Sequence, residues 1–585
     1  MLIYYKLSQL LTAEERRQVP LLLFFMIIGM IFEVVGVGVV IPIIALMTKP
    51  DFCANYENWL SMIGHPTQTQ LVIFSMMLLA GLYLVKAACS VYLTWKQNKF
   101  IFDVQANLSG RLFMGYLNQP WTFHLARNSA QLILNITNEV SVLIETALQP
   151  GLVLITEGLV LLGVAVFMCC VSPIITLTVV IVFGLIAYIL QHFSRKHIVR
   201  WGQARQHHEG LRVQHLQQGL GGAKDIKLLG REKDFFDQYN YHNLGYGQVG
   251  KKQKTLSELP RLWLELLANL GLVVTVLLMI AQNKTLDSLV PMLAFFAAAA
   301  FRLMPSINRL LGAVQNIRYC VPVINTLHDE IKLFNDVRPI IQNKNTLIFE
   351  HALTLEHVSF KYENTKTYVL DNLSLSISRG SSVGFIGASG AGKTSLIDVV
   401  LGLLPPEKGC VNVDGVSIYD NLRAWQNLIG YVPQTIYLID DSVRRNIAFG
   451  LSNDLIDDAA VRRAVKAAQL EQFISNLPDG LDTLVGERGI RLSGGQRQRI
   501  GIARALYHEP EVLVLDEATS ALDLDTEKEV MNAIDMLQGS KTLIIIAHRL
   551  STVARCDRVY KIKNGQIIAE GDFDAVTQLE KPAIA

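Results

Sequence analysis

Six long apolar stretches in the first part of the chain constrain its fold more than any other feature. The whole chain of 585 residues is 51% hydrophobic and 18% charged, an unusual balance for a soluble protein. A helix of about 20 apolar residues spans a hydrocarbon core of about 30 Å, and most of these stretches reach that length. We therefore predict six transmembrane helices, at residues 18–48, 71–95, 148–171, 173–193, 260–282 and 286–315.

The basic residues between these stretches indicate how the helices are oriented. Twelve lysines and arginines lie between Arg195 and Lys254, whereas the turn at residues 172–173 carries no charge. Because basic loops stay on the cytoplasmic side, we expect both termini in the cytoplasm. The first stretch follows Arg16 and lacks the short core of a removable signal peptide, so we expect it to be retained. The net charge of +2 reflects this orientation and gives no indication of nucleic-acid binding.

Two segments between the apolar stretches are too long for simple turns. Residues 96–147 and 194–259 carry helical patterning, so we expect membrane helices that continue far into the cytoplasm. Each segment must reverse direction, and chain breakers mark reversals near residues 120–125 and 222–235. The loop at residues 53–64 has apolar residues at helical spacing, and it fits either a short interfacial helix or an ordinary loop.

Beyond residue 335 the pattern changes from long apolar stretches to short alternating segments. A polar stretch within residues 336–347 predicts a linker, and the alternation in TLEHVSF and VLDNLSLSIS is typical of strands. We therefore divide the chain into a transmembrane domain at residues 1–335 and a second, α/β domain at residues 348–585.

The segment GASGAGKT, at residues 387–394, predicts a phosphate-binding loop. Its glycines let the backbone curl so that successive amides face phosphate oxygens, and the following helix adds its positive end. Lys393 would neutralise charge on the β- and γ-phosphates, and Thr394 would bind Mg2+. SVGFIG before the loop is typical of a strand, and SLIDVVLGLL after it is typical of a helix. Strand, loop and helix in this order argue against a chance match.

An acidic motif follows a second buried strand. The run VLVLD, at residues 512–516, is typical of a buried parallel strand, and it ends in Asp516, a suitable ligand for magnesium-bound water. Glu517 comes next, at the edge of the sheet where ligands bind, and can position and deprotonate an attacking water. His548 follows a further apolar run, TLIIIA. We therefore predict an α-helical membrane domain followed by an α/β P-loop ATPase domain that uses ATP and Mg2+.

With LSGGQ at residues 492–496 between these motifs, the whole chain resembles ATP-binding-cassette transporters. Six membrane helices followed by one cassette resemble an exporter-type half-transporter. The resemblance implies that Gln434 in YVPQ senses Mg2+ and the γ-phosphate, that His548 contacts the γ-phosphate, and that Asp523 in SALD communicates across a dimer. Glu487 in VGERG resembles a segment that links the cassette to the membrane domain.

The resemblance assigns the ATP site residue by residue. The residues with catalytic roles are Glu517, His548 and Gln434. The metal-binding residues are Thr394, Gln434 and Asp516. The nucleotide-binding residues are Tyr362, which would stack on adenine, and Gly387, Ala388, Ser389, Gly390, Ala391, Gly392, Lys393, Thr394, Ser395, Ser493, Gly494, Gly495 and Gln496.

In this family the LSGGQ loop faces the nucleotide of a partner chain. A serine hydroxyl and glycine amides at the start of a helix can donate to a phosphate. Because this chain has one cassette with every motif present, the resemblance implies a homodimer with two equivalent sites. It also implies a bacterial inner-membrane protein with the ATPase domain in the cytoplasm and with no substrate-binding protein as a partner.

Three cations lie inside the predicted membrane helices or at their inner mouth. Lys86, Arg261 and Arg302 are costly there, which makes them functional candidates. At about 1.5 Å per residue, Lys86 and Arg302 lie about 21 to 22 Å below the outer helix ends, and Arg261 marks the inner mouth. One interpretation is a path that binds an anionic lipid from the cytoplasmic leaflet, and the other is structural pairing. The glutamates available for pairing are Glu33, Glu157 and Glu265.

Several segments are similar to lipid-linked oligosaccharide flippases of the PglK type, among them LPRLWLE, FRLMPSINRL and the cationic site at Lys86. That family moves a polyprenyl-pyrophosphate glycan from the cytoplasmic to the outer face, and the resemblance implies the same cargo. The family has arginine at the first cationic position, whereas Lys86 keeps the charge without the bidentate fork. The alternatives are an exporter of a drug, lipid A or another lipid, and a membrane ATPase that gates a channel. No peptidase domain precedes the first helix, which disfavours a peptide-processing exporter.

Overall fold

The computed structural model describes residues 2–48, 68–171, 173–281, 286–336, 347–363, 365–517, 524–547 and 549–578. The chain forms two compact units. The first comprises Met1–Gln119 and Ala126–Val337, and the second comprises Pro120–Leu125 and Arg338–Ala585. The expected linker at residues 336–347 falls almost wholly outside the described residues, so the domain limits at 335 and 348 stay a prediction.

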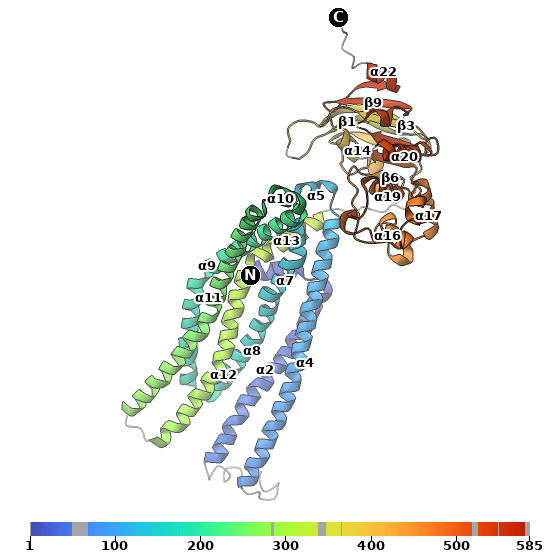
Figure 1. The fold of residues 1–585 in the computed structure, drawn as a ribbon. Coiled ribbons are helices and arrows are strands. Elements are labelled where there is room, and N and C mark those ends of the chain that lie inside the picture. Colours follow the sequence, from blue (N-terminus) through green and yellow to red (C-terminus); the bar gives the residue numbers. More distant parts are fainter. Residues whose placement is uncertain are drawn as a thin grey trace. The chain divides into compact units, whose positions relative to one another are not determined.

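Among the described residues, six long helices carry the six apolar stretches and make up most of the first unit (Figure 1). Three segments of the described chain have both the length and the composition to cross a membrane: Ala13–Gly36, Thr69–Leu117 and Ser129–Cys170. The predicted α-helical membrane domain is confirmed. The six helices are α2 (Ala13–Thr48), α4 (Gln68–Leu117), α8 (Gln149–Val171), α9 (Pro173–Gly221), α11 (Glu232–Ala281) and α12 (Leu286–Tyr319).

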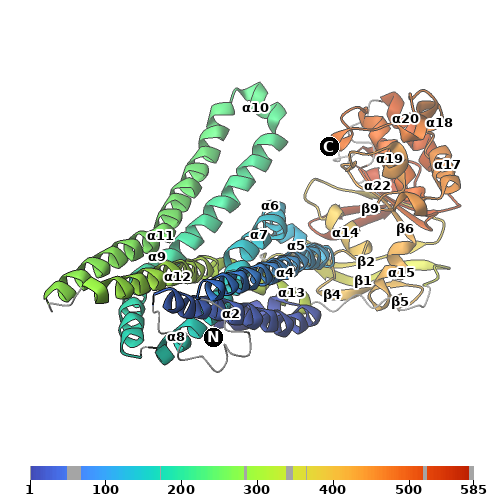
Figure 2. The ribbon, with the colours of Figure 1, turned by 90° about the horizontal axis from the view of Figure 1, so that it is seen from below.

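Three of these helices are far longer than a membrane requires. Helices α4, α9 and α11 run for 50, 49 and 50 residues. At 1.5 Å per residue each is about 75 Å long, against about 30 Å of hydrocarbon. Helices α9 and α11 pack against each other and run side by side in both Figure 1 and Figure 2. The prediction that helices continue well beyond the apolar stretches is confirmed.

Short helices lie at both predicted reversals. Helix α5 (Trp121–Ala126) begins after Pro120, and α10 (Ala223–Leu229) ends at Gly230, whose φ of 65° is the left-handed conformation that closes many helices. The expected interfacial helix at residues 53–64 lies outside the described residues. The remaining helices of the first unit are α1 (Leu2–Leu10), α6 (Ser129–Leu134), α7 (Val140–Leu143) and α13 (Val321–Asp336), with π-helical turns at Asn135–Glu139 and Ile144–Leu148.

The described residues of the second unit, the predicted α/β domain, form two sheets. The first is antiparallel, with the order β2-β1-β4-β5, and the second has the order β10-β9-β3-β8-β7-β6, in which only β10 pairs in the antiparallel sense. The strands predicted from alternation and from apolar runs are all present. The strands are β1 (Ala352–Phe360), β2 (Leu370–Ser378), β3 (Ser382–Ile386), β4 (Lys408–Val413), β5 (Val416–Ser417), β6 (Ile429–Val432), β7 (Val512–Asp516), β8 (Thr542–Ile546), β9 (Arg558–Lys563) and β10 (Gln566–Gly571).

The helix that follows the phosphate loop is held by the cassette core. Helix α14 (Lys393–Val400) buries Leu396 and Val399 in one apolar cluster with residues of β1, β3 and β7. Trp425 is fully buried and donates from Nε1 to the carbonyl oxygen of Val400 at 2.7 Å. The other cassette helices are α15 (Leu422–Asn427), α16 (Val443–Ile447), α17 (Asp458–Ala467), α18 (Glu471–Ser475), α19 (Gly494–Leu506), α20 (Leu524–Asp535), α21 (Leu550–Val553) and α22 (Phe573–Gln578).

Candidate nucleotide site and membrane cations

Motif-bearing loops leave the same edge of the parallel sheet. Strands β3, β8, β7 and β6 are adjacent and parallel, so their carboxyl ends meet at one edge, where ligands of such sheets bind. The phosphate loop follows β3, Glu517 follows β7, and Gln434 lies two residues beyond β6. His548 follows β8 by two residues in the sequence but lies outside the described residues. The sheet order therefore brings together motifs that are far apart along the chain.

The phosphate loop requires glycine at two positions. At Gly387 φ is 154°, and a Cβ atom there would lie 2.3 Å from the carbonyl oxygen of Ile562. At Gly392 φ is 103°, and a Cβ atom would lie 2.7 Å from the carbonyl oxygen of Val369. Both positions thus combine a left-handed backbone with a close approach to another segment. A tightly curled backbone of this kind, leading into a helix, fits the phosphates of ATP.

Lys393 lies against the loop that precedes it. Its side chain is buried, and Nζ donates to the carbonyl oxygens of Gly387 at 2.8 Å and Ala388 at 3.1 Å. Burial lowers the pKa of Lys393, and the nearby carboxylates of Glu517 and Asp516 oppose this shift. Phosphate oxygens are charged and therefore stronger acceptors than these neutral carbonyls. The predicted role of Lys393 at the β- and γ-phosphates fits this position.

Asp516 ends β7 as a buried carboxylate, 4% exposed. Tyr431 on the neighbouring strand β6 shares a hydrogen bond with it, and burial together with this carboxylate raises the pKa of the tyrosine hydroxyl. Burial, followed by repulsion from Asp516, raises the pKa of Asp398 on α14 to about 6. A bound Mg2+ would offset this crowding of negative charge, and it is usually held by one or two carboxylates together with substrate phosphates. The residues therefore fit the expected metal.

The sequence analysis assigns a role to neither Tyr431, the first residue of YVPQ, nor Asp398. Tyr431 precedes Gln434 by three residues, and its strand β6 lies beside β7. Its contact with Asp516 could be predicted only from the order of the strands, which the motifs do not give. Asp398 follows Lys393 by five residues in an otherwise apolar helix, which makes it a charged residue in a buried segment. An isolated charge of that kind is a usable signal.

Glu517 has an unusual backbone conformation at the end of β7. Its φ is 49°, a left-handed value that costs a residue with a side chain about 1 to 2 kcal/mol. Its amide donates to the carbonyl oxygen of Ile546 at 3.1 Å, which ties it to the end of β8. Its Oε2 atom accepts a hydrogen bond from Nε2 of Gln434 at 2.6 Å. The predicted general base and the predicted magnesium sensor are therefore in direct contact.

Two hydroxyl-bearing residues follow Lys393 with different exposure. Thr394 is exposed at the start of α14. Its hydroxyl is therefore accessible to a metal ion, as its predicted role as a magnesium ligand requires. Ser395 is buried, and its Oγ lies 3.0 Å from the hydroxyl of Tyr362, the residue expected to stack on adenine. The ring of Tyr362 also packs edge-on against Phe360 at 5.1 Å. Tyr362 is thus held beside the phosphate loop, and its stacking role stays a prediction.

The LSGGQ segment begins helix α19 with a capping box. The amide of Gln496 donates to Oγ of Ser493 at 3.2 Å, and the amide of Ser493 donates to Oε1 of Gln496 at 2.9 Å. Because the Ser493 hydroxyl accepts this bond, its own proton remains available to a ligand. The amides of Gly494 and Gly495 lie in the first turn, where a helix provides no acceptor of its own. The exposed end of α19 therefore presents donors that suit a phosphate.

Arg504, near the other end of α19, is a positioning residue that the motifs do not reveal. It donates to the carbonyl oxygens of Asn446 and Tyr437, both at 2.8 Å, and its guanidinium lies 4.4 Å from the ring centre of Phe449. Burial lowers its pKa to about 10. Arg504 thus joins the segment that follows Gln434 to the helix that begins at Ser493.

In the membrane domain, Lys86 is paired with a carboxylate. Its Nζ lies 2.9 Å from Oε2 of Glu33 and 5.0 Å from the ring centre of Tyr83. The Lys86 and Glu33 side chains are 17% and 22% exposed, so helices α4 and α2 largely cover the pair. One of the structural pairings that the sequence leaves open is therefore present.

The other predicted cations differ in their surroundings. Arg261 is exposed within this chain, and its Nε lies 2.9 Å from Oε1 of Glu265 on the same helix. Arg302 lies on α12, but its side chain is outside the described part of the structure. Oε1 of Glu157 forms an ion pair with Nε of Arg309 on α12 at 2.7 Å. The sequence signal for Arg309 was its place in FRLMPSINRL, seven residues after Arg302.

These features define the class of the protein. One sheet edge carries a phosphate loop, a buried aspartate and a glutamate held by a glutamine, and the same chain has six long helices with apolar stretches. This is an ATP-hydrolysing domain joined to a membrane domain.

The chain belongs to the ABC transporters. The family model described as ABC transporter transmembrane region matches residues 20–303, and the family model described as ABC transporter matches residues 370–520. Together the two matches cover well over half of the chain. A membrane domain followed by a single cassette is the arrangement of an exporter-type half-transporter.

The similarity to known proteins extends over most of the chain. The ATP-dependent lipid A-core flippase of Ralstonia nicotianae is 29% identical over 499 residues, which cover 84% of this chain and 83% of that protein. The heterocyst differentiation ATP-binding protein HepA of Nostoc sp. is 28% identical over 601 residues, 98% of this chain and 95% of that protein. A solved bacterial Atm1-family ABC exporter with ATP bound has a TM-score of 0.78 at 23% identity and covers 97% of this chain and 96% of its own. That likeness shows the fold.

Proposed function

We propose that this protein is an ATP-driven flippase that moves a polyprenyl-pyrophosphate-linked oligosaccharide from the cytoplasmic to the outer leaflet. The observation that carries the proposal is a lysine within an apolar helix, Lys86 of α4, in a chain with the full series of ATP-site motifs. Curated relatives named as flippases support a lipid-like cargo. The pyrophosphate glycan itself rests on the resemblance of LPRLWLE and FRLMPSINRL to the PglK type.

In the proposed ATP reaction, Glu517 accepts a proton from the attacking water. Gln434 already contacts this carboxylate and would hold it toward the γ-phosphate, while Lys393 neutralises phosphate charge. Thr394 and Asp516 would hold Mg2+ together with Gln434; when bound, the ion supplies further neutralisation of the phosphates. We assign His548 to the γ-phosphate.

A homodimer completes the proposed site. Ser493 is exposed at the start of α19, and the amides of Gly494 and Gly495 follow in its first turn, which suits a phosphate supplied by another chain. The single cassette carries every motif, so two copies of the chain would form two equivalent ATP sites. Closing and opening of this dimer would drive the membrane helices.

The pairing of Lys86 is compatible with cargo binding. A lysine at membrane depth is costly when it is alone, and Glu33 lowers that cost in the absence of cargo. A pyrophosphate carries more negative charge than a carboxylate, so it can compete for the lysine and release Glu33. Arg261 keeps an exposed guanidinium at the inner mouth, bonded only to a surface glutamate among the described contacts of this residue. Lys86 and Arg261 could therefore each exchange a glutamate partner for a phosphate group of the cargo.

We further propose a bacterial inner-membrane location with both termini and the cassette in the cytoplasm. The twelve basic residues between Arg195 and Lys254 support this orientation through the positive-inside rule. The segment Pro120–Leu125 groups with the cassette unit, as expected of a coupling segment at a cytoplasmic reversal.

A second candidate is a flippase for lipid A or a related amphiphile. Several curated relatives at 28 to 29% identity are ATP-dependent lipid A-core flippases. Lipid A also carries phosphate, so the same cations would suit its headgroup. The two candidates share the ATP chemistry and differ in the cargo that the membrane domain accepts.

The decisive experiment is a flipping assay in proteoliposomes. The purified chain is reconstituted with a polyprenyl-pyrophosphate sugar, with lipid A, with a neutral phospholipid or with a cationic drug, and the Glu517→Gln variant is the control without hydrolysis. We expect ATP-dependent movement of the pyrophosphate lipid above all others. Preferential movement of lipid A would favour the second candidate. Hydrolysis without movement of any of them would indicate an ATPase that gates a channel or supports a complex.

A further inference from the structure

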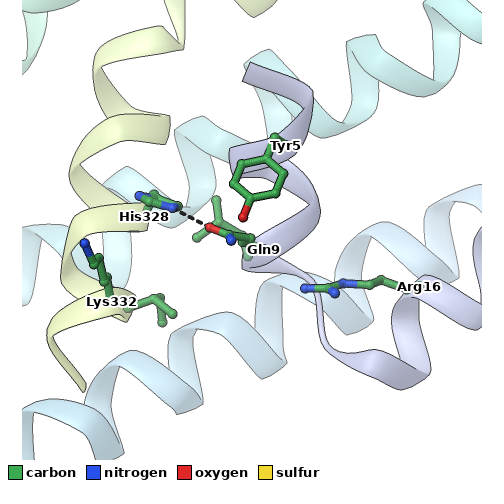
Figure 3. A pocket seen from close by; sticks show the side chains of 7 residues that line it. Tyr5, Gln9, Arg16, His328 and Lys332 are labelled. Atoms are coloured by element: carbon green, nitrogen blue, oxygen red, sulfur yellow. Dashed lines mark hydrogen bonds between the residues drawn. The ribbon is translucent and has the colours of Figure 1, made fainter. Parts of the chain in front are cut away.

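A basic pocket lies at the N-terminal end of the membrane domain, lined by residues of α1, α2 and α13. It has a volume of about 520 Å3, within the range of about 300 to 1,000 Å3 that is typical of small-ligand sites. Figure 3 shows its labelled side chains: Tyr5 and Gln9 on α1, Arg16 on α2, and His328 and Lys332 on α13. The buried side chains of Leu10 and Ile331 complete the lining. The pocket is therefore partly apolar and edged by basic groups.

The wall of the pocket is fixed by a hydrogen bond between two helices. Nε2 of His328 lies 2.6 Å from Oε1 of Gln9, and Lys6 on the same face of the contact donates to Oδ1 of Asn325 at 2.8 Å. These bonds hold α1 against α13 without using Arg16 or Lys332, the two exposed cations that line the pocket. The cavity is thus built by packing and polar contacts rather than by the cations themselves.

Arg16 and Lys332 have no side-chain hydrogen bond or ion pair within the described part of the chain, although both line the pocket. A third cation, Arg111, is near enough to Arg16 for their charges to repel. The nearest acid on α2, Glu15, is buried and accepts bonds from the Thr12 amide at 2.7 Å and from Asn107 at 3.0 Å. Glu15 also attracts Arg111, and none of the described residues that line the pocket is an acid, so its lining keeps an excess of positive charge.

The two acids on α13 whose side chains are described, Asp329 and Glu330, both have partners, and Oε1 of Glu330 lies 2.6 Å from Nη1 of Arg127. Asp329 lies 3.1 Å from Nδ1 of His328 and is otherwise directed to solvent, with 69% of its side chain exposed. One acid beside the histidine does not neutralise both Arg16 and Lys332. A ligand with a negative charge would supply the partner that neither cation has.

The position along the chain places this pocket at a membrane surface. The first apolar stretch begins at residue 18, directly after Arg16 and Arg17, and the side chains of Leu21 and Phe24 on the same helix are exposed. Tyr4 and Tyr5 on α1 are exposed too, and tyrosine is typical of membrane interfaces. With the proposed orientation, the pocket lies on the cytoplasmic side of the membrane, beside the start of α2 and the part of α4 that continues past its apolar stretch, and basic pockets on this side bind anionic lipids.

We propose that this pocket binds the phosphate headgroup of an anionic phospholipid from the cytoplasmic leaflet. Arg16 and Lys332 pair with the phosphate, and Leu10 and Ile331 contact the glycerol and upper acyl carbons. The site is separate from the cargo path and takes a lipid of the bulk membrane. The inference rests on the proposed orientation of the membrane domain, not on the identity of the cargo.

The test compares two double variants that lose the same charge. Arg16→Gln/Lys332→Gln removes the two pocket cations, whereas Arg17→Gln/Lys252→Gln removes two exposed cations that do not line the pocket. Each chain is placed in nanodiscs of phosphatidylcholine and titrated with phosphatidylglycerol that carries a fluorophore on an acyl chain. We expect the pocket variant to bind about 30-fold more weakly, about fivefold for each lost cation. The control should keep most of the wild-type affinity.

Two further measurements guard against misfolding and against a soluble ligand. Arg16→Lys/Lys332→Arg should restore binding, and phosphatidylglycerol should slow amide exchange in α1 and α13 of the wild-type chain. Glycerol 3-phosphate should not displace the lipid. Equal affinity in the two double variants would overturn the proposal, and displacement by glycerol 3-phosphate would reassign the pocket to a soluble phosphate. Binding is read without transport, so the result is independent of the flipping assay.

Discussion

The nucleotide site and the membrane cations can both be located from the sequence, but the structure indicates the ligand of the first far more clearly than the ligand of the second. In the cassette, Gln434 contacts Glu517, and Lys393 lies against its own loop, at an edge shaped by the backbone. In the membrane domain, Lys86 and Arg261 are each paired with a glutamate. A backbone cradle indicates its ligand because few groups other than phosphate fit it. A paired side-chain charge indicates only that the charge is tolerated there.

The largest test of this comparison removes the acid at the sheet edge. Glu517→Gln should lower ATP hydrolysis by roughly 100-fold to 10,000-fold while ATP still binds, because the amide cannot accept the proton of the attacking water. Steady-state phosphate release and nucleotide binding give the two readouts. The matched control is Glu511→Gln, which changes an acid at the opposite end of β7. Hydrolysis close to the wild-type rate would place the general base elsewhere.

The next test asks whether the cradle depends on backbone shape. Gly392→Ala should abolish binding of an ATP analogue and lower stability by about 2 to 4 kcal/mol, since a Cβ atom would meet the Val369 carbonyl at 2.7 Å in a left-handed residue. Gly390→Ala is the control, because its φ of 81° carries the same kind of strain with no atom within 4 Å. Equal losses in the two variants would show that strain alone, not the close approach, limits the loop.

A third test separates cargo binding from structural pairing in the membrane. If Lys86 binds cargo, Lys86→Gln should lower flipping about tenfold or more, whereas Glu33→Gln should leave the lysine available and raise the apparent affinity for the pyrophosphate lipid. If the pair is only structural, both variants should lose stability and flipping to a similar extent. Glu157→Gln, which breaks the pair with Arg309, serves as the control.

The smallest expected effect concerns the crowded acids behind the site. The pKa of Asp398 in the folded protein, about 6, exceeds its ordinary value of 3.8, so the folded state binds this proton more tightly than the unfolded state. Stability from this group is therefore lost as the pH rises from about 4 to about 6. Asp398→Asn should stabilise the cassette by roughly 1 to 2 kcal/mol at pH 7.5, without a gain at pH 4.

Amide exchange of α14 at the two pH values measures this effect. Asp420→Asn, at an exposed position of the same domain, is the control. A pH-independent gain would show that the benefit comes from packing and not from the charge of Asp398.

Local patterns explain which parts of the fold the sequence predicts. The apolar stretches and the alternating strands each depend on residues close together in the chain, and these predictions are confirmed. The loop glycines are also read from local sequence, and their role in binding phosphate stays a prediction. The contact between Tyr431 and Asp516 depends on β6 lying beside β7, and the bonds of Arg504 depend on how α19 packs, so neither follows from a motif. The ion pairs of the membrane domain show the same limit. Glu33, Glu157 and Glu265 are all visible as candidates, but only the helix packing assigns Glu157 to Arg309.

The order of the strands also determines a distance within the site. One strand, β8, separates the strand of the phosphate loop from the strand that ends at Glu517, and neighbouring strands lie about 4.8 Å apart. The loop and the carboxylate are therefore held about 10 Å from each other by the sheet, a span that an extended triphosphate and one attacking water can fill. The hydrogen bond from the amide of Glu517 to the carbonyl oxygen of Ile546 holds the carboxylate end of this span against the end of β8. The distance between the phosphate loop and the carboxylate is thus set by hydrogen-bonded backbone. Side-chain substitutions at this edge leave that distance unchanged.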